Sequence, residues 1–202
     1  MSVIVPALAE DVELSRVRAH WGRLEGDWEV LVAEGAGRAR PLNAVAATAR
    51  GELLLFLHAD SRLPADAYTS LACAAADPEV VGGNFALRFE GGDVFARVLT
   101  AVYALKRRFG WYYGDSSVWV RRSVFEALGG YRELPIMDDC DFVSRLEAAG
   151  RTVCLPGPAH TSDRRWRAVG VPRTLLSWWA VRWLYVAGVS PARLARLYRR
   201  IR

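Results

Sequence analysis

A run of five apolar residues, Leu53 to Leu57, ends abruptly on His58 and Asp60. An apolar run of this length is typical of a strand that is buried on both faces of a parallel sheet. Ligands of open α/β sheets bind beyond the carboxyl ends of the strands, so His58 and Asp60, two positions apart, would face that crevice together. Because hard oxygen ligands leave coordination positions free for phosphate, the pair indicates a divalent cation on a diphosphate. The alternative is that Asp60 only shapes the turn before Pro64.

The length of 202 residues and the apolar fraction of 52% are sufficient for one well-buried α/β domain. The net charge of +5 is carried by arginine almost alone, since Lys106 is the single lysine. Ten arginines and no acidic residue occur between Arg164 and Arg202, interleaved with tryptophan and tyrosine. This combination is typical of binding to nucleic acid, to an anionic membrane surface or to a phosphate-rich substrate. A solvated face with a buried aromatic stripe is the alternative.

The cysteines and the apolar segments indicate in which cellular compartment the protein is expected. Cys73, Cys140 and Cys154 are widely spaced, so they indicate neither a disulfide framework nor a thiolate zinc site, and a reducing compartment fits best. The first six residues lack the features of a signal peptide, and the apolar segment 174–189 is too short to span a bilayer. We therefore expect a cytoplasmic protein, with peripheral attachment to the inner face of the cell membrane as an alternative.

Strand and helix patterns alternate along the chain, which predicts an α/β fold of the Rossmann-like type with a mostly parallel sheet flanked by helices. The predicted strands cover residues 3–5, 29–33, 52–57 and 80–89, with a further strand that ends at 120. The predicted helices cover residues 11–23, 41–50, 65–76, 93–109, 122–131 and 137–149. Gly51 is expected to cap the second of these helices. Residues 1–172 are expected to form one domain, contracted around 33–40, and residues 173–202 a helical extension packed on the domain or on a membrane.

Three carboxylates, Asp138, Asp139 and Asp141, open the helix predicted at 137–149. The helix dipole favours acidic residues in a first turn, so the cluster has a structural explanation. Three carboxylates nevertheless exceed what capping requires. Crowded like charges raise the pKa of at least one carboxyl group, and a raised pKa makes a carboxylate a usable general base.

Four blocks of sequence, in this order, resemble the family 2 glycosyltransferases of the GT-A fold. The blocks are residues 2–6, 55–60, 125–131 and 137–139. The sequence is most similar to a small bacterial subgroup, the transferases associated with radical-SAM and selenium-related domains. Hallmarks of that subgroup occur at residues 37–43, 57–61, 114–115, 164–166 and 188–191.

The resemblance implies transfer of a sugar from a nucleotide-sugar donor, a UDP-sugar in the first place, to the hydroxyl of a small or lipid-linked acceptor. It implies an inverting reaction with Mn²⁺ or Mg²⁺, in which Asp139 is the catalytic base and Asp138 stands in the place of the family's glutamate. No nucleic-acid partner is expected. The implied donor-side residues are Pro6, Glu10, Glu34, Arg38, Asn43, His58 and Asp60. The implied acceptor-side residues are Gly114, Asp115, Asp141, Arg165 and Trp166.

The metal is assigned to Asp60 and His58, where His58 takes the position of the first acid of the family's Asp-x-Asp motif. His160 is expected to be either a satisfied surface imidazole or a third metal ligand on a loop that closes over the donor. The choice between these two roles stays open at this point.

The chain also departs from the family pattern. Ala9-Glu10 stands where relatives have Asn-Glu, and Glu34 leads almost directly into Arg38, so about one helix and one strand are missing near the expected nucleobase site. Either Glu34 substitutes in a contracted pocket, or the chain is a degenerate, non-catalytic member that binds a membrane or an anion. A nucleotidyltransferase would need a glycine-rich loop after the first strand, and residues 6–10 contain no glycine.

Overall fold

The apolar run forms strand β3 (Leu53–Phe56) of the computed structural model, and its side chains alternate between two hydrophobic cores. Leu54 and Phe56 belong to one core, and Leu53 and Leu55 to the other. The alternation follows from the two-residue period of a strand. The prediction of a strand buried on both faces is confirmed.

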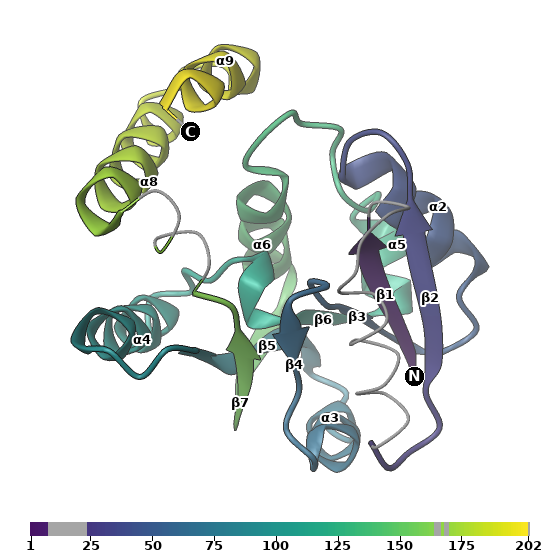
Figure 1. Ribbon diagram of the computed structural model, residues 1–202. Coiled ribbons are helices and arrows are strands. Elements are labelled where there is room, and N and C mark those ends of the chain that lie inside the picture. Colours follow the sequence, from purple (N-terminus) through teal and green to yellow (C-terminus); the bar gives the residue numbers. More distant parts are fainter. Residues whose placement is uncertain (8–23, 164–166, 168–169, 202) are drawn as a thin grey trace.

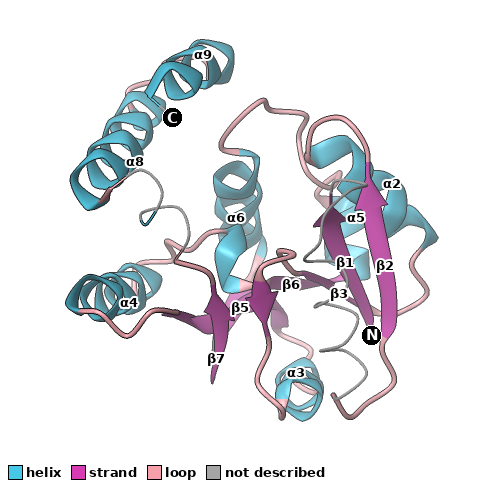
Figure 2. Ribbon diagram, viewed as in Figure 1, coloured by secondary structure: helices cyan, strands magenta, loops and turns pink. Residues whose placement is uncertain are grey.

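The structure describes residues 1–7, 24–163, 167 and 170–201, which include a seven-stranded sheet in the order β2-β1-β3-β6-β5-β7-β4 (Figures 1 and 2). The other strands are β1 (Ser2–Ala7), β2 (Glu29–Glu34), β4 (Ser61–Arg62), β5 (Val80–Phe89), β6 (Val118–Arg121) and β7 (Arg151–Thr161). The helix predicted at 11–23 lies outside the described residues.

Helices cover both faces of this sheet (Figure 2). They are α2 (Ala39–Thr48), α3 (Ala67–Ala75), α4 (Val94–Arg107), α5 (Arg122–Ala127), α6 (Asp138–Ala149), α8 (Val171–Val186) and α9 (Pro191–Ile201), with a short 3₁₀ helix, η1 (Gly114–Ser116). Helices α2, α5 and α6 enclose the core that contains Phe56, whereas α3 packs Leu71 into the core on the opposite face. The fold is thus the predicted α/β arrangement of a sheet between helices.

The sheet is mixed, which corrects the expectation of a mostly parallel one. Strands β1, β2 and β3 are parallel neighbours, and β5 is parallel to β7. Strand β6 lies antiparallel between β3 and β5, and β4 is antiparallel to β7. Whether two strands are parallel or antiparallel depends on how both of them pair, so the apolar character of one strand cannot predict it.

The strand β7 was not predicted, although it is the longest in the sheet, because Pro156, Gly157 and Pro158 interrupt its pattern. The pairing with β5 passes from Phe85–Leu155 to Leu87–Ala159, so β7 uses two more residues than its partner there. A bulge therefore absorbs the Pro-Gly-Pro segment.

The end of α2 also differs from the prediction. The helix covers Ala39–Thr48 and ends two residues before the position predicted, with an extended Ala49 in place of a cap at Gly51. The backbone amide of Arg50 donates to the Glu29 carboxylate at 2.7 Å, which takes the chain out of the helix. Gly51 is required for another reason, since a Cβ there would lie 2.5 Å from the backbone nitrogen of Ser2.

A third, smaller core joins α4 to the end of β5 and contains Leu87, Phe89, Ala96 and Leu99. Trp178 of α8 packs against this core, so part of the aromatic carboxyl-terminal segment covers the domain itself. Among the described helices, none is long and apolar enough to cross a membrane.

Candidate active site at the carboxyl edge of the sheet

Four segments meet beyond the carboxyl ends of β2 and β3. His58 follows β3, Arg38 precedes α2, Gly114 begins η1 just before β6, and Asp138 begins α6. Because β6 runs antiparallel to β3, the start of β6 lies next to the end of β3. This edge is where ligands of open α/β sheets bind.

The guanidinium of Arg38 lies at the centre of this cluster. Its Nη1 atom is 3.4 Å from Oδ2 of Asp138 and 3.9 Å from Oδ2 of Asp139, and its Nη2 atom is 2.9 Å from Nε2 of His58. The Arg38 Cζ atom also lies 5.9 Å from the centre of the Tyr131 ring. One cation thus contacts two carboxylates, an imidazole and an aromatic face.

The two carboxylates differ in exposure and in pKa. The Asp138 side chain is 9% exposed, and burial raises its pKa while Arg38 offsets only part of that effect. Burial also acts to raise the pKa of Asp139, but Arg38 and the Gly114 amide outweigh it, so the pKa lies below its ordinary value. The carboxyl group with the raised pKa is therefore Asp138, and Asp139, the base that the resemblance implies, has the lowered pKa. The expected activation of a base through a raised pKa thus does not apply to Asp139, which is ionised and 22% exposed.

The backbone around Asp139 is held closely. Gly114 donates its amide to Oδ2 of Asp139 at 3.0 Å. Met137, directly before α6, has a φ of 66° in the left-handed region, which is uncommon for a residue with a side chain. A Cβ on Gly114 would lie 2.4 Å from Nη2 of Arg38, so only glycine leaves room for the guanidinium.

Asp60 lies in a turn, in which the Ser61 amide donates to the carbonyl oxygen of His58 at 3.0 Å. The turn predicted at this position is present, and Ser61 and Arg62 then form the short strand β4, which was not expected. Asp60 therefore both shapes a turn and lies at the end of the β3 connection.

Few side chains at this edge could bind a divalent cation. No group of three or more His, Cys, Asp or Glu side chains in the described residues is arranged to hold a metal. Because Arg38 occupies Nε2 of His58, the nearby carboxylate of Asp60 is the remaining hard ligand at the end of β3. Such a set fits a magnesium-type site, in which one or two carboxylates act together with substrate phosphates.

His160 lies on β7, opposite Arg62 of β4 and Arg88 of β5. Burial, and then the charge of Arg88, lower its pKa, so the imidazole is neutral at pH 7. His160 is thus part of a strand, and not of the closing loop that the metal-ligand alternative requires.

Two predicted site residues make structural contacts. Asn43 donates to the carbonyl oxygen of Tyr131 at 2.7 Å and accepts from the Tyr131 amide at 2.9 Å, which fixes the turn after α5. Asp141 forms ion pairs with Arg132 at 2.9 Å and with Arg145 at 2.8 Å.

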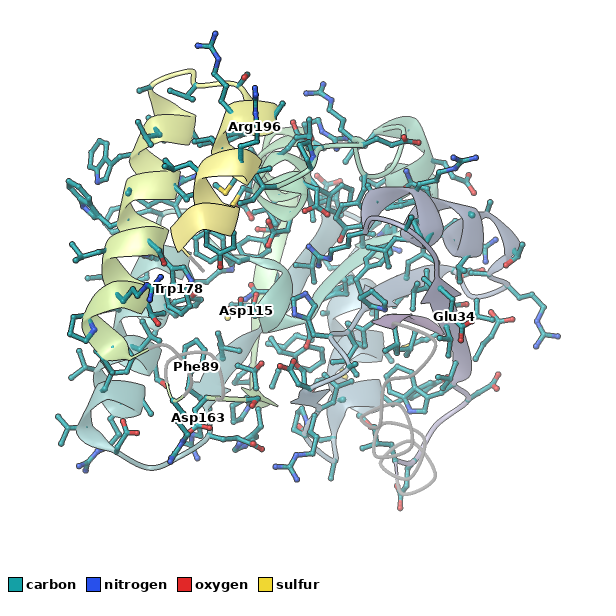
Figure 3. The ribbon with its side chains drawn as sticks, turned by 45° about the horizontal axis from the view of Figure 1, so that its top comes forward. Glu34, Phe89, Asp115, Asp163, Trp178 and Arg196 are labelled. Atoms are coloured by element: carbon teal, nitrogen blue, oxygen red, sulfur yellow. The ribbon has the colours of Figure 1, made fainter. Side chains whose placement is uncertain are left out.

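The remaining predicted residues are spread along the edge. Pro6 and Glu34 lie at the ends of β1 and β2, with Glu34 exposed, and Asp115 lies in η1. Figure 3 shows Asp115 between Glu34 on one side and Trp178 of α8 on the other. Glu10, Arg165 and Trp166 lie outside the described residues.

The sequence did not predict the position of Tyr131 beside the Arg38 guanidinium, or the presence of two cations near Asp115, Lys106 and Arg182. Lys106 is the chain's single lysine, and Arg182 interrupts the apolar segment 174–189. Each of these two features is a sequence signal that singles out the residue.

No protein-family model and no curated protein sequence matches the chain. Several solved structures, in contrast, match the chain in fold. A fragment of S. aureus TarS, residues 1-349, in complex with UDP-GlcNAc aligns with a TM-score of 0.64 and 13% identity, over 80% of this chain and 58% of that fragment. The mannosyltransferase PcManGT from Pyrobaculum calidifontis, in complex with GDP-Man and Mn²⁺, aligns with a TM-score of 0.62 and 20% identity, over 90% and 59% of the two chains.

The catalytic domain of Drosophila beta1,4galactosyltransferase 7, in complex with xylobiose, aligns with a TM-score of 0.52 and 16% identity, over 77% and 64% of the two chains. The chain thus spans about three fifths of the length of these structures. At these identities the likeness shows the fold, and it confirms the predicted GT-A-like α/β class.

Proposed function

We propose that this protein is an inverting, metal-dependent glycosyltransferase that moves a sugar from a nucleotide-sugar donor to an acceptor hydroxyl. The observation that carries the proposal is the meeting of Arg38, His58 and the Asp138–Asp139 pair at the carboxyl edge of the sheet. Its fold, shared with structures that hold UDP-GlcNAc and GDP-Man, supports the same reaction class. The resemblance in sequence supports assignment to the bacterial subgroup associated with radical-SAM domains.

In the proposed reaction the acceptor oxygen bonds to C1 of the sugar as the bond from C1 to the diphosphate oxygen breaks. The acceptor proton passes to Asp139, and the electron pair of the broken bond leaves with the nucleoside diphosphate. Arg38 holds Asp139 in place and keeps it ionised. A divalent cation, held by Asp60 with the donor's phosphates, would supply positive charge to the leaving group.

The acceptor is proposed to come from a membrane surface. Helix α8 exposes Trp179 by 65% and Trp183 by 58%, although Trp178 beside them is packed on the domain. Arginines flank these rings, and the segment 164–202 contains no acidic residue. Exposed aromatic rings beside basic side chains are the composition of a helix that lies in an anionic interface.

A thermal-shift screen tests the donor. UDP-, GDP- and dTDP-sugars are compared with and without Mn²⁺, because a ligand of the native state raises the melting temperature. We expect a shift with at least one sugar nucleotide that needs the metal, followed by slow release of nucleoside diphosphate. A shift without any turnover in the presence of acceptors would favour the non-catalytic, anion-binding alternative. The absence of a shift with every sugar nucleotide would overturn the proposal.

A further inference from the structure

Two cations, Lys106 at the end of α4 and Arg182 in the middle of α8, lie on aromatic rings beside the candidate active site. The Nζ atom of Lys106 is 5.5 Å from the centre of the Tyr103 ring and 5.6 Å from that of Tyr113. The Cζ atom of Arg182 is 5.4 Å from the centre of the Trp111 ring. Both cations are partly buried, and the rings hold them while leaving their N–H donors available.

The charges of these two side chains are only partly offset by the acids near them. Among the described residues, neither Lys106 nor Arg182 forms an ion pair with a carboxylate, whereas Arg38, Arg107 and Arg145 each do. The two cations lie close together, because the amide of Trp111, whose ring holds Arg182, donates to the carbonyl oxygen of Lys106 at 3.1 Å. Burial and then the charge of Arg182 accordingly lower the pKa of Lys106. Two like charges held close together without an ion-paired carboxylate are an arrangement that suits an anion.

Lys106 and Arg182 lie close to residues that the resemblance assigns to acceptor binding. The carboxylate of Asp115 in η1 is close enough to raise the pKa of Lys106 in part. Arg182 lines a groove of about 590 Å³ together with Asp141, Ser144 and Tyr185, between α6 and the turn that joins α8 to α9. An anion at the pair would therefore lie near Asp115, one of the residues that the resemblance places on the acceptor side.

Exposed apolar stripes lie on both helices that supply the cations. The stripe on α4 consists of Val94, Val98, Val102 and Leu105, and the stripe on α8 consists of Leu176, Trp179, Trp183 and Val186. Their spacing of three and four residues places each set on one face of its helix. An apolar chain attached to an anion at Lys106 and Arg182 would therefore find exposed apolar side chains on α4 and on α8.

We propose that Lys106 and Arg182 form a subsite for a phosphate group of the acceptor, so that the acceptor is a phosphorylated molecule and, with the apolar stripes, a lipid phosphate. The proposal rests on the proposed sugar transfer for its biological meaning. It goes further by naming the chemical class of the acceptor and two residues that recognise it.

Titration calorimetry with decyl phosphate, inorganic phosphate and the uncharged decyl glucoside tests the subsite. Lys106→Gln and Arg182→Gln each remove one charge of the pair, whereas Lys106→Arg keeps the charge at position 106. Arg196→Gln removes an exposed charge of α9 and is the matched control. We expect decyl phosphate to bind the wild type, and each Gln variant to bind it about tenfold more weakly. Lys106→Arg and Arg196→Gln should stay within about twofold of the wild type.

The outcomes separate the sources of the anion. Tighter binding of decyl phosphate than of inorganic phosphate supports a lipid phosphate, and equal affinity supports a soluble phosphorylated acceptor at the same subsite. The subsite is overturned if the wild type binds neither phosphate, if the Gln variants bind as tightly as the wild type, or if decyl glucoside binds as well as decyl phosphate.

Failure of the subsite can be told apart from failure of the proposed function. The sugar-nucleotide thermal shift is measured on the same variants, and far-UV circular dichroism checks that they fold. A retained shift without phosphate binding rejects the subsite alone. Phosphate binding without any sugar-nucleotide shift rejects the glycosyltransferase proposal and leaves the anion subsite in place.

Discussion

The Nη2 atom of Arg38 lies 2.9 Å from the Nε2 atom of His58. A guanidinium has only donors, so the Nε2 atom of His58 must accept, and the imidazole is neutral with its proton on Nδ1. The loop before α2 and the end of β3 are joined by this contact, and the same guanidinium lies 3.4 Å from Asp138 and 3.9 Å from Asp139. The position of Arg38 therefore controls both the candidate base and the candidate cation site.

Displacement of Arg38 should reduce turnover without unfolding the protein. In Gly114→Ala the new Cβ would lie 2.4 Å from Nη2 of Arg38 and 3.0 Å from Nε2 of His58, so the guanidinium has to move. We expect turnover to fall by a factor of about 100, as displacements of about 1 Å in active sites do. Steady-state rates and melting curves measure this, and undiminished turnover would show that the position of Arg38 does not matter.

Asp139→Asn should remove the proton acceptor and keep the shape of the side chain. We expect turnover to fall by a factor of about 100 to 10,000 while the sugar nucleotide still binds. Rates and the sugar-nucleotide thermal shift are measured on the same sample, with Asp138→Asn in parallel. If Asp139→Asn keeps near-normal turnover and Asp138→Asn does not, the base is Asp138.

Asp60→Ala should abolish the metal-dependent part of nucleoside diphosphate binding. His58→Asp should preserve or strengthen that part, because it adds a second carboxylate, a hard ligand, to the end of β3 beside Asp60. Titration calorimetry with UDP or GDP, in Mn²⁺ and in EDTA, measures the metal dependence. Equal affinity in the two buffers for the wild type would remove the cation from the mechanism.

Glu29 should contribute stability that depends on pH. Hydrogen bonds from Ser2 and from the Arg50 amide lower its pKa from 4.5 to about 2. Because the folded-state pKa is the lower one, this stabilisation is complete above pH 4.5 and is lost as the pH falls towards 2.

The substitution Glu29→Gln tests this contribution. We expect it to lower the free energy of unfolding by about 1 to 2 kcal/mol at pH 7, and by less near pH 2. Urea unfolding at both pH values measures the difference, with Glu126→Gln on the exposed face of α5 as the control. The same deficit at both pH values would mean that the Glu29 charge is not involved.

Membrane attachment through α8 should depend on both charge and aromatic rings. We expect co-sedimentation with anionic vesicles at low salt, weaker binding as salt rises, and about 1 kcal/mol from each arginine near the surface. The double substitution Trp179→Ser and Trp183→Ser should reduce binding without a change in charge. Equal sedimentation with neutral and anionic vesicles would leave the segment as a cover of the domain.

The local elements could be predicted because their signals are contained within a few neighbouring residues. The apolar run of β3, the strand at β5 and the acidic start of α6 each have a period or a composition that belongs to one structure. The class of fold follows from their order along the chain. Strand β7 could not be predicted, because its Pro-Gly-Pro segment is tolerated only through a bulge against β5.

The candidate site also has features that the sequence predicts and features that only the tertiary structure decides. The sequence by itself determined which side chains are available: two carboxylates at a helix start, a histidine and an aspartate after a buried strand, and an arginine before a helix. Only the tertiary structure decided that Arg38 contacts Asp138, one hundred residues away, that Asp139 rather than Asp138 has the lowered pKa, and that Asn43 fixes a turn. The reason is physical: periodicity and capping act within one or two turns of chain, whereas burial and charge depend on which distant segments the packed sheet brings together.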